Sequence, residues 1–158
     1  MIVKDNVLKK EIFKPIQKLL MGNEFPWFYE NKQVEKDSSF LFHYFHYKHI
    51  INSDYFKIIE PILNYLDPVS LILVRANLLL NRTKSSSNYH TDVNNLKSKT
   101  AIFYINTNNG YTEFYDGTKV DCVENRIVIF TSELAHKAVA QTDTDQRIVI
   151  NINYFENN

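Results

Sequence analysis

The chain has 158 residues, of which 44% are hydrophobic and 14% aromatic, and this composition suits a globular protein with a sizeable core rather than a disordered chain. Its 18 basic side chains balance 18 acidic ones, so the net charge gives no reason to expect a nucleic-acid partner or an anionic membrane surface. No stretch of about 18 apolar residues occurs, so no membrane span is expected. The single cysteine, Cys122, excludes an intrachain disulfide and fits a reducing compartment.

The N-terminal part of the chain, about residues 1–69, contains two segments with apolar residues at helical spacing. The first helix is predicted to begin with Asn6 as its N-cap and to end at Gly22, with Pro15 as a possible kink. The second is predicted to start at residues 53–54 and to stop at Asp67. Between them we expect a strand near Trp27, a turn at residues 36–39 and an extended, aromatic segment at residues 40–51.

The pattern changes after residue 69 to short strands separated by turns. The turns are expected at residues 108–110, 116–117 and 142–145, and a polar loop at residues 82–88. The predicted strands are residues 70–81, a strand around His90, and residues 100–106, 111–114, 120–124, 126–130, 136–141 and 146–155. This succession predicts an antiparallel sandwich or jelly roll over about residues 70–156. The whole chain, residues 1–158, is expected to be one mainly β (α+β) domain with its N-terminal helices packed on one sheet.

Four polar residues of this C-terminal part suggest a metal site. His90 and Asp92 stand two residues apart on the predicted strand, so their side chains would point to the same face. His136, from another strand, would complete a 2-His-1-carboxylate set, which suits non-haem Fe(II) and leaves one side of the ion open. Arg147 would then offer a fixed fork for the carboxylate of a co-substrate. The same ligands also suit Mn, Co, Ni or Zn.

The order His90-x-Asp92, His136, Arg147 resembles that of the Fe(II)- and 2-oxoglutarate-dependent dioxygenases, and the prolyl 4-hydroxylase-like branch fits best. The resemblance covers most of residues 70–156, and it also rests on the segments 100–106, 109–114, 126–130 and 146–151. The sequence departs from the branch in three places. A single glycine, Gly110, stands where two are usual, Val149 replaces a frequent Ser or Thr, and the loop before His90 is longer.

The resemblance implies a double-stranded β-helix, or jelly-roll, core with Fe(II) held by His90, Asp92 and His136. It further implies 2-oxoglutarate as co-substrate, with its far carboxylate on Arg147 and on the phenol of Tyr104, O2 as a reactant and ascorbate as a possible supporting reductant. The implied reaction is hydroxylation of a C–H bond, as in a prolyl 4-hydroxylase, with decarboxylation of 2-oxoglutarate to succinate. The substrate would be a peptide or a small molecule, and the setting a microbial or viral protein of the cytoplasm.

Several alternatives remain open from the residues alone. The same chemistry can act on a nucleobase, a free amino acid or a small metabolite, and the chain can instead be a non-catalytic metal-binding jelly roll. His90 and Asp92 can form an exposed polar strand edge, and Arg147 a solvated cross-strand partner. Tyr104 can simply pack in the core, and Thr112 can contact 2-oxoglutarate or fill the barrel.

Two further groups of residues are candidates for a substrate pocket and for a second metal site. Arg75 and Asn77 share one face of a predicted strand, where they either line the mouth of a substrate pocket or pair with neighbours. His43, His46 and His49 are spaced by three and would cluster on a helix, which would suggest a second metal site. Their aromatic, β-favouring surroundings indicate a strand instead, which would divide them between two faces.

Overall fold

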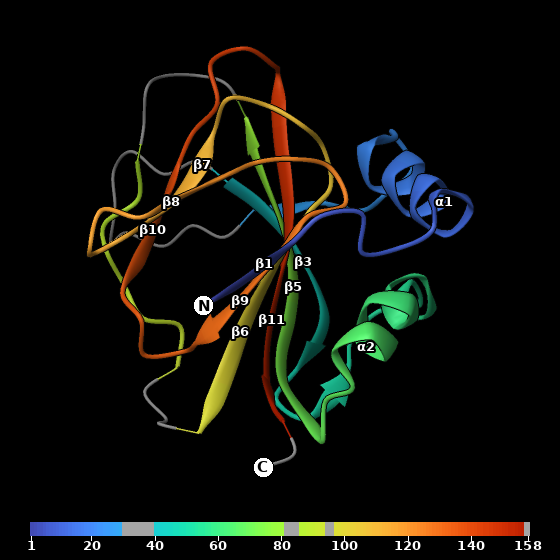
Figure 1. The fold of residues 1–158 in the computed structure, drawn as a ribbon. Helices are drawn as coiled ribbons and strands as arrows, with labels where there is room; N and C mark the ends of the chain where they lie inside the picture. Colours follow the sequence, from blue (N-terminus) through green and yellow to red (C-terminus); the bar gives the residue numbers. More distant parts are fainter. Residues whose placement is uncertain (30–39, 81–85, 94–96, 157–158) are drawn as a thin grey trace.

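The computed structural model describes residues 1–29, 40–80, 86–93 and 97–156, and these form two antiparallel sheets packed face to face (Figure 1). The large sheet has the order β1 (Ile2–Lys4), β9 (Ile127–Thr131), β6 (Ser98–Tyr104), β11 (Gln146–Phe155), β5 (Ser70–Leu80), β3 (Phe40–Tyr47) and β2 (Phe28–Tyr29), and β4 (Ile50–Ile51) pairs with β3. The small sheet has the order β10 (His136–Val139), β7 (Tyr111–Phe114) and β8 (Lys119–Asp121).

Two helices cover the outer face of the large sheet, opposite the small sheet (Figure 1). They are α1 (Lys10–Met21) and α2 (Glu60–Leu66), the latter preceded by a 3-10 turn, Phe56–Ile59. One buried apolar cluster joins both helices to β3, β5, β6 and β11. The expected mainly β class, with a jelly-roll core and helices on one sheet, is therefore confirmed.

The two faces of the large sheet differ in polarity because side chains alternate along each strand. On β11 the buried Ile148, Ile150 and Ile152 belong to the cluster beneath the helices. Residues that alternate with them, among them Arg147, Asn151 and Asn153, point to the opposite face, towards the small sheet. On β5 Val74, Ala76 and Leu78 likewise pack under the helices, whereas Arg75 and Asn77 lie on the inner face. The sheet thus presents polar groups to the space between the two sheets.

The start of α1 differs from the prediction that Asn6 caps it. Asn6 has a positive φ of 53°, and the N-cap position falls at Lys9, whose side chain forms no capping hydrogen bond. Asn125, distant in sequence, instead ties down this segment: the N–H of Leu8 donates to its Oδ1 at 3.0 Å, and its Nδ2 donates to the carbonyl of Leu8 at 2.8 Å. Pro15 lies inside the helix without ending it, and Gly22 is the C-cap as predicted.

Most other sequence predictions of this part are confirmed. Residues 40–51 form the hairpin β3–β4, whose two loop residues, Lys48 and His49, have the positive φ values that a tight turn of this kind requires. Asp67 ends α2 in a left-handed conformation. The turn predicted at residues 36–39 and residues 82–85 of the predicted loop lie outside the described residues. None of the helices that the structure describes is long and apolar enough to cross a membrane.

The packing of the helices on the sheet can be tested at Ile150, a fully buried residue of β11. Ile150→Ala leaves a cavity in the cluster beneath the helices, so the free energy of unfolding should fall by about 2–5 kcal/mol in a urea titration. Tyr115→Ala, at a residue that is 76% exposed, is the control and should change it little. A loss at Ile150 as small as that of the control would contradict this packing.

Candidate metal centre

His90 and His136 are brought together by their own backbones. The N–H of each donates to the carbonyl oxygen of the other at 3.0 Å, which forms an isolated antiparallel bridge beside β10. The prediction of a regular strand around His90 is wrong, because among the described residues the segment pairs through this isolated bridge and another between Ser86 and Val139. Asp92 lies in a bend just after the bridge. The bend, rather than strand alternation, returns its carboxylate towards His90.

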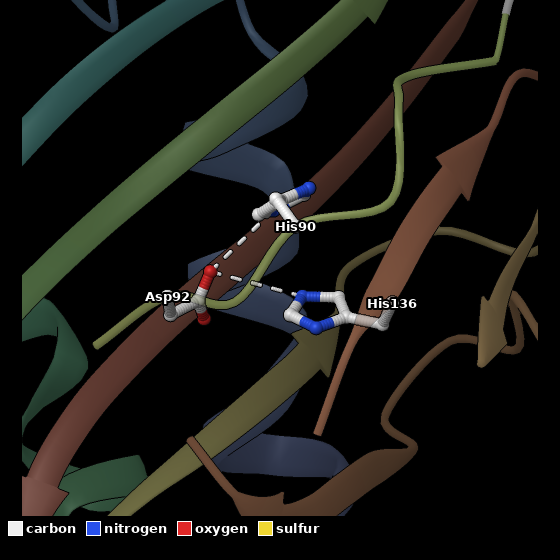
Figure 2. Close-up of side chains that lie close together, drawn as sticks. All are labelled: His90, Asp92 and His136. Carbon is white, nitrogen blue, oxygen red and sulfur yellow. Dashed lines mark ion pairs between the residues drawn. The ribbon is translucent and has the colours of Figure 1, made fainter. Parts of the chain in front are cut away.

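The three side chains converge on a common point (Figure 2). One ligand atom from each of them lies within 4.8 Å of the other two. Oδ1 of Asp92 is 3.5 Å from Nε2 of His90 and 3.7 Å from Nε2 of His136. Two ligands bound at right angles, each ~2.1 Å from a metal, stand ~3 Å apart. Small side-chain movements are therefore enough to place all three atoms around one ion.

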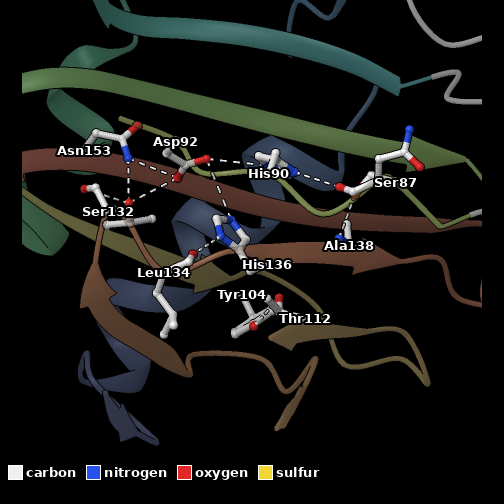
Figure 3. Close-up of polar contacts among 12 residues, drawn as sticks. Ser87, His90, Asp92, Tyr104, Thr112, Ser132, Leu134, His136, Ala138 and Asn153 are labelled. Carbon is white, nitrogen blue, oxygen red and sulfur yellow. Dashed lines mark hydrogen bonds and ion pairs between the residues drawn. The ribbon is translucent and has the colours of Figure 1, made fainter. Parts of the chain in front are cut away.

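Both imidazoles are oriented by a backbone carbonyl (Figure 3). Nδ1 of His90 lies 3.0 Å from the carbonyl oxygen of Asn88, and Nδ1 of His136 lies 3.0 Å from that of Leu134. Because a carbonyl only accepts, each Nδ1 carries the proton and donates. In the neutral form of each ring Nε2 then carries the lone pair, which is the tautomer that a metal ligand needs.

Asp92 is held by polar side chains of the large sheet (Figure 3). Its Oδ2 accepts hydrogen bonds from Nδ2 of Asn153 at 3.1 Å and from the hydroxyl of Thr100 at 3.2 Å. Asn153 also donates to Thr100 at 2.8 Å, and Thr100 contacts the hydroxyl of Ser132 at 3.0 Å. Sequence reasoning missed these supports. The sequence does contain a sign of the role of Asn153: on the predicted strand 146–155 it lies on the same face as Arg147.

The protonation states follow from burial and from neighbouring charges. Burial raises the pKa of Asp92, but the hydrogen bond with His90, the charge of His136 and the hydrogen bond from Asn153 outweigh it and lower the pKa to about 2. The hydrogen bond with Asp92 is the main reason that the pKa of His90 is raised. Burial lowers the pKa of His136, against the opposing charge of Asp92. At neutral pH the centre therefore contains a carboxylate beside at least one neutral imidazole.

A pocket of about 360 Å³ lies between the sheets, and His90, His136 and Arg147 all line it. Arg147 is only 1% exposed, yet its Nε and Nη1 have no hydrogen-bond partner within the part of the chain that the structure describes. Two unsatisfied donors on a buried cation are costly, so this geometry favours an anion from outside the chain. A carboxylate that approaches from the pocket would fit the guanidinium fork.

The surroundings of Arg147 restrict how its side chain can lie. The guanidinium carbon is 6.0 Å from the ring centre of Tyr104, whose hydroxyl is 2.8 Å from that of Thr112. Burial raises the pKa of Tyr104 to about 12, so its phenol keeps its proton and remains a donor. A Cβ on Gly110 would lie 3.0 Å from Cδ of Arg147 and 2.9 Å from the carbonyl oxygen of Val139. Gly110, which has no Cβ, therefore leaves room for the Arg147 side chain.

The other candidate site residues lie in different parts of the structure. Arg75 and Asn77 lie in the pocket wall. His43 and His46 are buried and His49 is exposed, and the three do not form a cluster of metal ligands among the described residues. His43 is occupied by hydrogen bonds to the carbonyl of Pro26 and the hydroxyl of Ser53. Cys122 is buried.

Comparison with solved structures identifies the fold. A prolyl hydroxylase from Trichoplax adhaerens, in complex with a peptide fragment of the hypoxia inducible factor oxygen degradation domain, superposes with a TM-score of 0.75 at 14% identity, over 98% of this chain and 82% of that one. A Pseudomonas putida prolyl-4-hydroxylase gives 0.61 at 14% identity, over 99% and 92% of the two chains. The epimerase SnoN, in complex with Fe3+, alpha ketoglutarate and nogalamycin RO, gives 0.67 at 12% identity, over 98% and 78%. The chain therefore has the fold of 2-oxoglutarate-dependent oxygenases. Neither a protein-family model nor a curated protein matches the sequence.

Metal binding should depend on pH through His90. Because its pKa is raised above 6.5, protons compete for the ligand nitrogen at a higher pH than for an ordinary histidine. The affinity for Mn(II), measured by calorimetry on the metal-free protein, should already fall as the pH is lowered from about 8 towards about 6.5. An affinity that stays constant over this range would contradict the assignment of His90 as a ligand.

The support of Asp92 by Asn153 predicts a specific defect. Asn153→Leu removes the hydrogen bond to the carboxylate, so the affinity for Mn(II) should fall about 10- to 100-fold. Asn52→Leu, at an exposed residue outside the pocket lining, is the matched control and should leave the affinity unchanged. Thermal unfolding of both metal-free variants separates a positioning defect from a loss of folding. Equal metal affinities in the two variants would show that Asn153 does not position Asp92.

Proposed function

We propose that this protein is an Fe(II)- and 2-oxoglutarate-dependent dioxygenase that hydroxylates a C–H bond of its substrate. The observation that carries the proposal is the combination found in one pocket. Two of the three converging metal ligands, His90 and His136, line it, and so does the buried guanidinium of Arg147, whose Nε and Nη1 have no acceptor among the described residues. A metal-chelating diacid would satisfy both ends at once.

In this proposal His90, Asp92 and His136 hold the iron. Two imidazole nitrogens and one carboxylate oxygen are the ligand set typical of non-haem Fe(II) oxygenases, and these three side chains would hold such an ion. Bound iron, with 2-oxoglutarate and O2, supplies the oxidising chemistry that replaces C–H by C–OH while 2-oxoglutarate becomes succinate and CO2. Asn153 and Thr100 keep the Asp92 carboxylate turned towards the two histidines.

Arg147 is proposed to bind the far carboxylate of 2-oxoglutarate. Its Nε and Nη1, which have no partner among the described residues, are the donors that a carboxylate of the co-substrate would use, in a charge-assisted hydrogen bond to Arg147. The phenol of Tyr104 and the hydroxyl of Thr112 stand next to this end and are proposed as further donors. Leu79 and Val149 line the pocket beside it and would exclude water.

The nature of the substrate is the less constrained part of the proposal. The two prolyl hydroxylases among the structural neighbours make peptidyl proline the first substrate to test, and one of them was captured with a peptide. The same fold also serves the epimerase and carbocyclase of nogalamycin biosynthesis, so fold alone does not distinguish a peptide from a small molecule.

Two substitutions can distinguish the role of the metal ligands from the role of Arg147. His136→Ala removes a metal ligand and should abolish Fe(II) or Mn(II) binding, measured by calorimetry. Arg147→Met should bind the metal like the parent but raise the KM for 2-oxoglutarate about 10- to 100-fold, because it removes a charge-assisted ion pair. Succinate formation with Fe(II) and ascorbate, with and without proline-containing peptides, reports activity, and Lys57→Gln, at an exposed cation on the helical side, is the control.

Two outcomes would contradict the proposal. If both variants bind metal and 2-oxoglutarate like the parent, the site is assigned to the wrong residues. If the parent forms no succinate, and 2-oxoglutarate with a divalent ion gives no gain in thermal stability, the protein is a metal-binding jelly roll without this activity.

A further inference from the structure

A second polar group of residues stands in the pocket wall, away from Arg147. It consists of Arg75 and Asn77 on β5 and Asn151 on β11, here called the β5–β11 cluster. Arg75 and Asn151 are direct cross-strand partners, and Asn77 lies two residues along the same face of β5. All three side chains therefore point into the pocket that His90 and His136 also line.

Arg75 is a fixed cation without a carboxylate partner in the described ranges. Its guanidinium carbon stands 5.7 Å from the ring centre of Phe40 and 5.8 Å from that of Tyr44, so aromatic faces hold the group in place. Its Nε is buried and has no hydrogen-bond acceptor there. The cluster thus offers a positioned positive charge with an unused donor.

The two asparagines offer the opposite chemistry. Oδ1 of Asn77 and Oδ1 of Asn151 are buried, and neither receives a hydrogen bond from a residue that the structure describes. The cluster therefore combines two free acceptor oxygens with the cationic guanidinium of Arg75. A ligand that carries an anionic group beside a hydrogen-bond donor would be complementary to it. A water molecule can satisfy one such atom, but it cannot neutralise the guanidinium.

Two members of the β5–β11 cluster stand apart from the Arg147 end of the pocket. Arg147 pairs with Leu79 and Asn151 with Arg75, so four residues of strand, about 13 Å, separate these two levels, and Asn77, which pairs with Val149, lies between them. Asn153, which holds Asp92, follows Asn151 by two residues on the same face of β11, so Arg75 and Asn151 are nearer to the metal ligands than to Arg147. Arg75 also lines the same pocket as His90 and His136.

We propose that the substrate hydroxylated at this site is a free α-amino acid, bound by the β5–β11 cluster. The inference rests on the proposed function and specifies its substrate class. The α-carboxylate pairs with Arg75, and the α-ammonium donates to the amide oxygens of Asn77 and Asn151. An internal residue of a peptide carries neither charge on its main chain, so a peptidyl substrate would leave the cluster unpaired.

The anchored zwitterion leaves the amino-acid side chain to face the metal ligands. The reaction is R–H + O2 + 2-oxoglutarate → R–OH + succinate + CO2. One oxygen atom of O2 enters the new C–OH bond and the other enters the new carboxylate of succinate. The four electrons that reduce O2 come in equal parts from the broken C–H bond and from the decarboxylated 2-oxoglutarate.

The test uses the full chain with Fe(II), ascorbate and 2-oxoglutarate, and it presents the twenty standard L-amino acids one at a time. At least one of them should raise succinate formation above the rate without substrate and gain one oxygen atom by mass spectrometry. The amide of the same amino acid, which lacks the carboxylate, should have a KM about 10- to 100-fold higher.

Arg75→Gln supplies the matched variant. It should raise the KM of the active amino acid about 10- to 100-fold while the KM for 2-oxoglutarate without substrate stays unchanged, and Arg75→Lys should recover part of the loss. A higher KM for 2-oxoglutarate in Arg75→Gln would assign Arg75 to the co-substrate and overturn the inference. Succinate formation that no free amino acid stimulates would also overturn it, with the proposed function intact, whereas the absence of succinate under every condition would reject both.

Discussion

The pair of backbone hydrogen bonds between His90 and His136 is the constraint on which this site depends. It fastens a segment with little regular structure to the edge of the small sheet, and it sets the two imidazoles with ring centres 4.7 Å apart. The bend that follows turns Asp92 back to them, and Asn153 attaches that carboxylate to the large sheet. The centre thus joins both sheets, and a shift of one sheet against the other would disperse its ligands.

The pocket beside this centre contains two arginine side chains that no carboxylate neutralises among the described residues. Arg147 is buried and Arg75 is partly buried, and neither has a carboxylate partner among the residues that the structure describes. Folding must bear the cost of removing these groups from water. The apolar clusters on both faces of the large sheet offset this cost, because one packs beneath the helices and the other between the sheets. Apolar side chains thereby supply stability, and the residues that alternate with them present polar groups to the pocket.

The strand and helix predictions succeeded where the chain has a strong local pattern. β7 and β11 begin and end as predicted, and the remaining named strands of the large and small sheets fall within a few residues of their predicted ranges. Two local predictions failed because a residue distant in the sequence forms the hydrogen bonds that a local residue was predicted to form. Asn125 satisfies the backbone at Leu8 in place of an Asn6 cap, and pairing with β10 holds His90 without a strand of its own. In both cases the decisive partner lies far away in the sequence.

The sequence by itself determined the types and order of the chemical groups: two histidines and a carboxylate, followed by an arginine on a strand whose faces alternate. Such alternation is a local property, and it can be seen without a fold. Only the tertiary structure decided that Asn153 and Thr100 hold Asp92, that carbonyls set both imidazole tautomers, and that Arg75 meets Asn151 across two strands. These contacts depend on strand order and register, which arise from the packing of the whole chain and are not contained in any short segment.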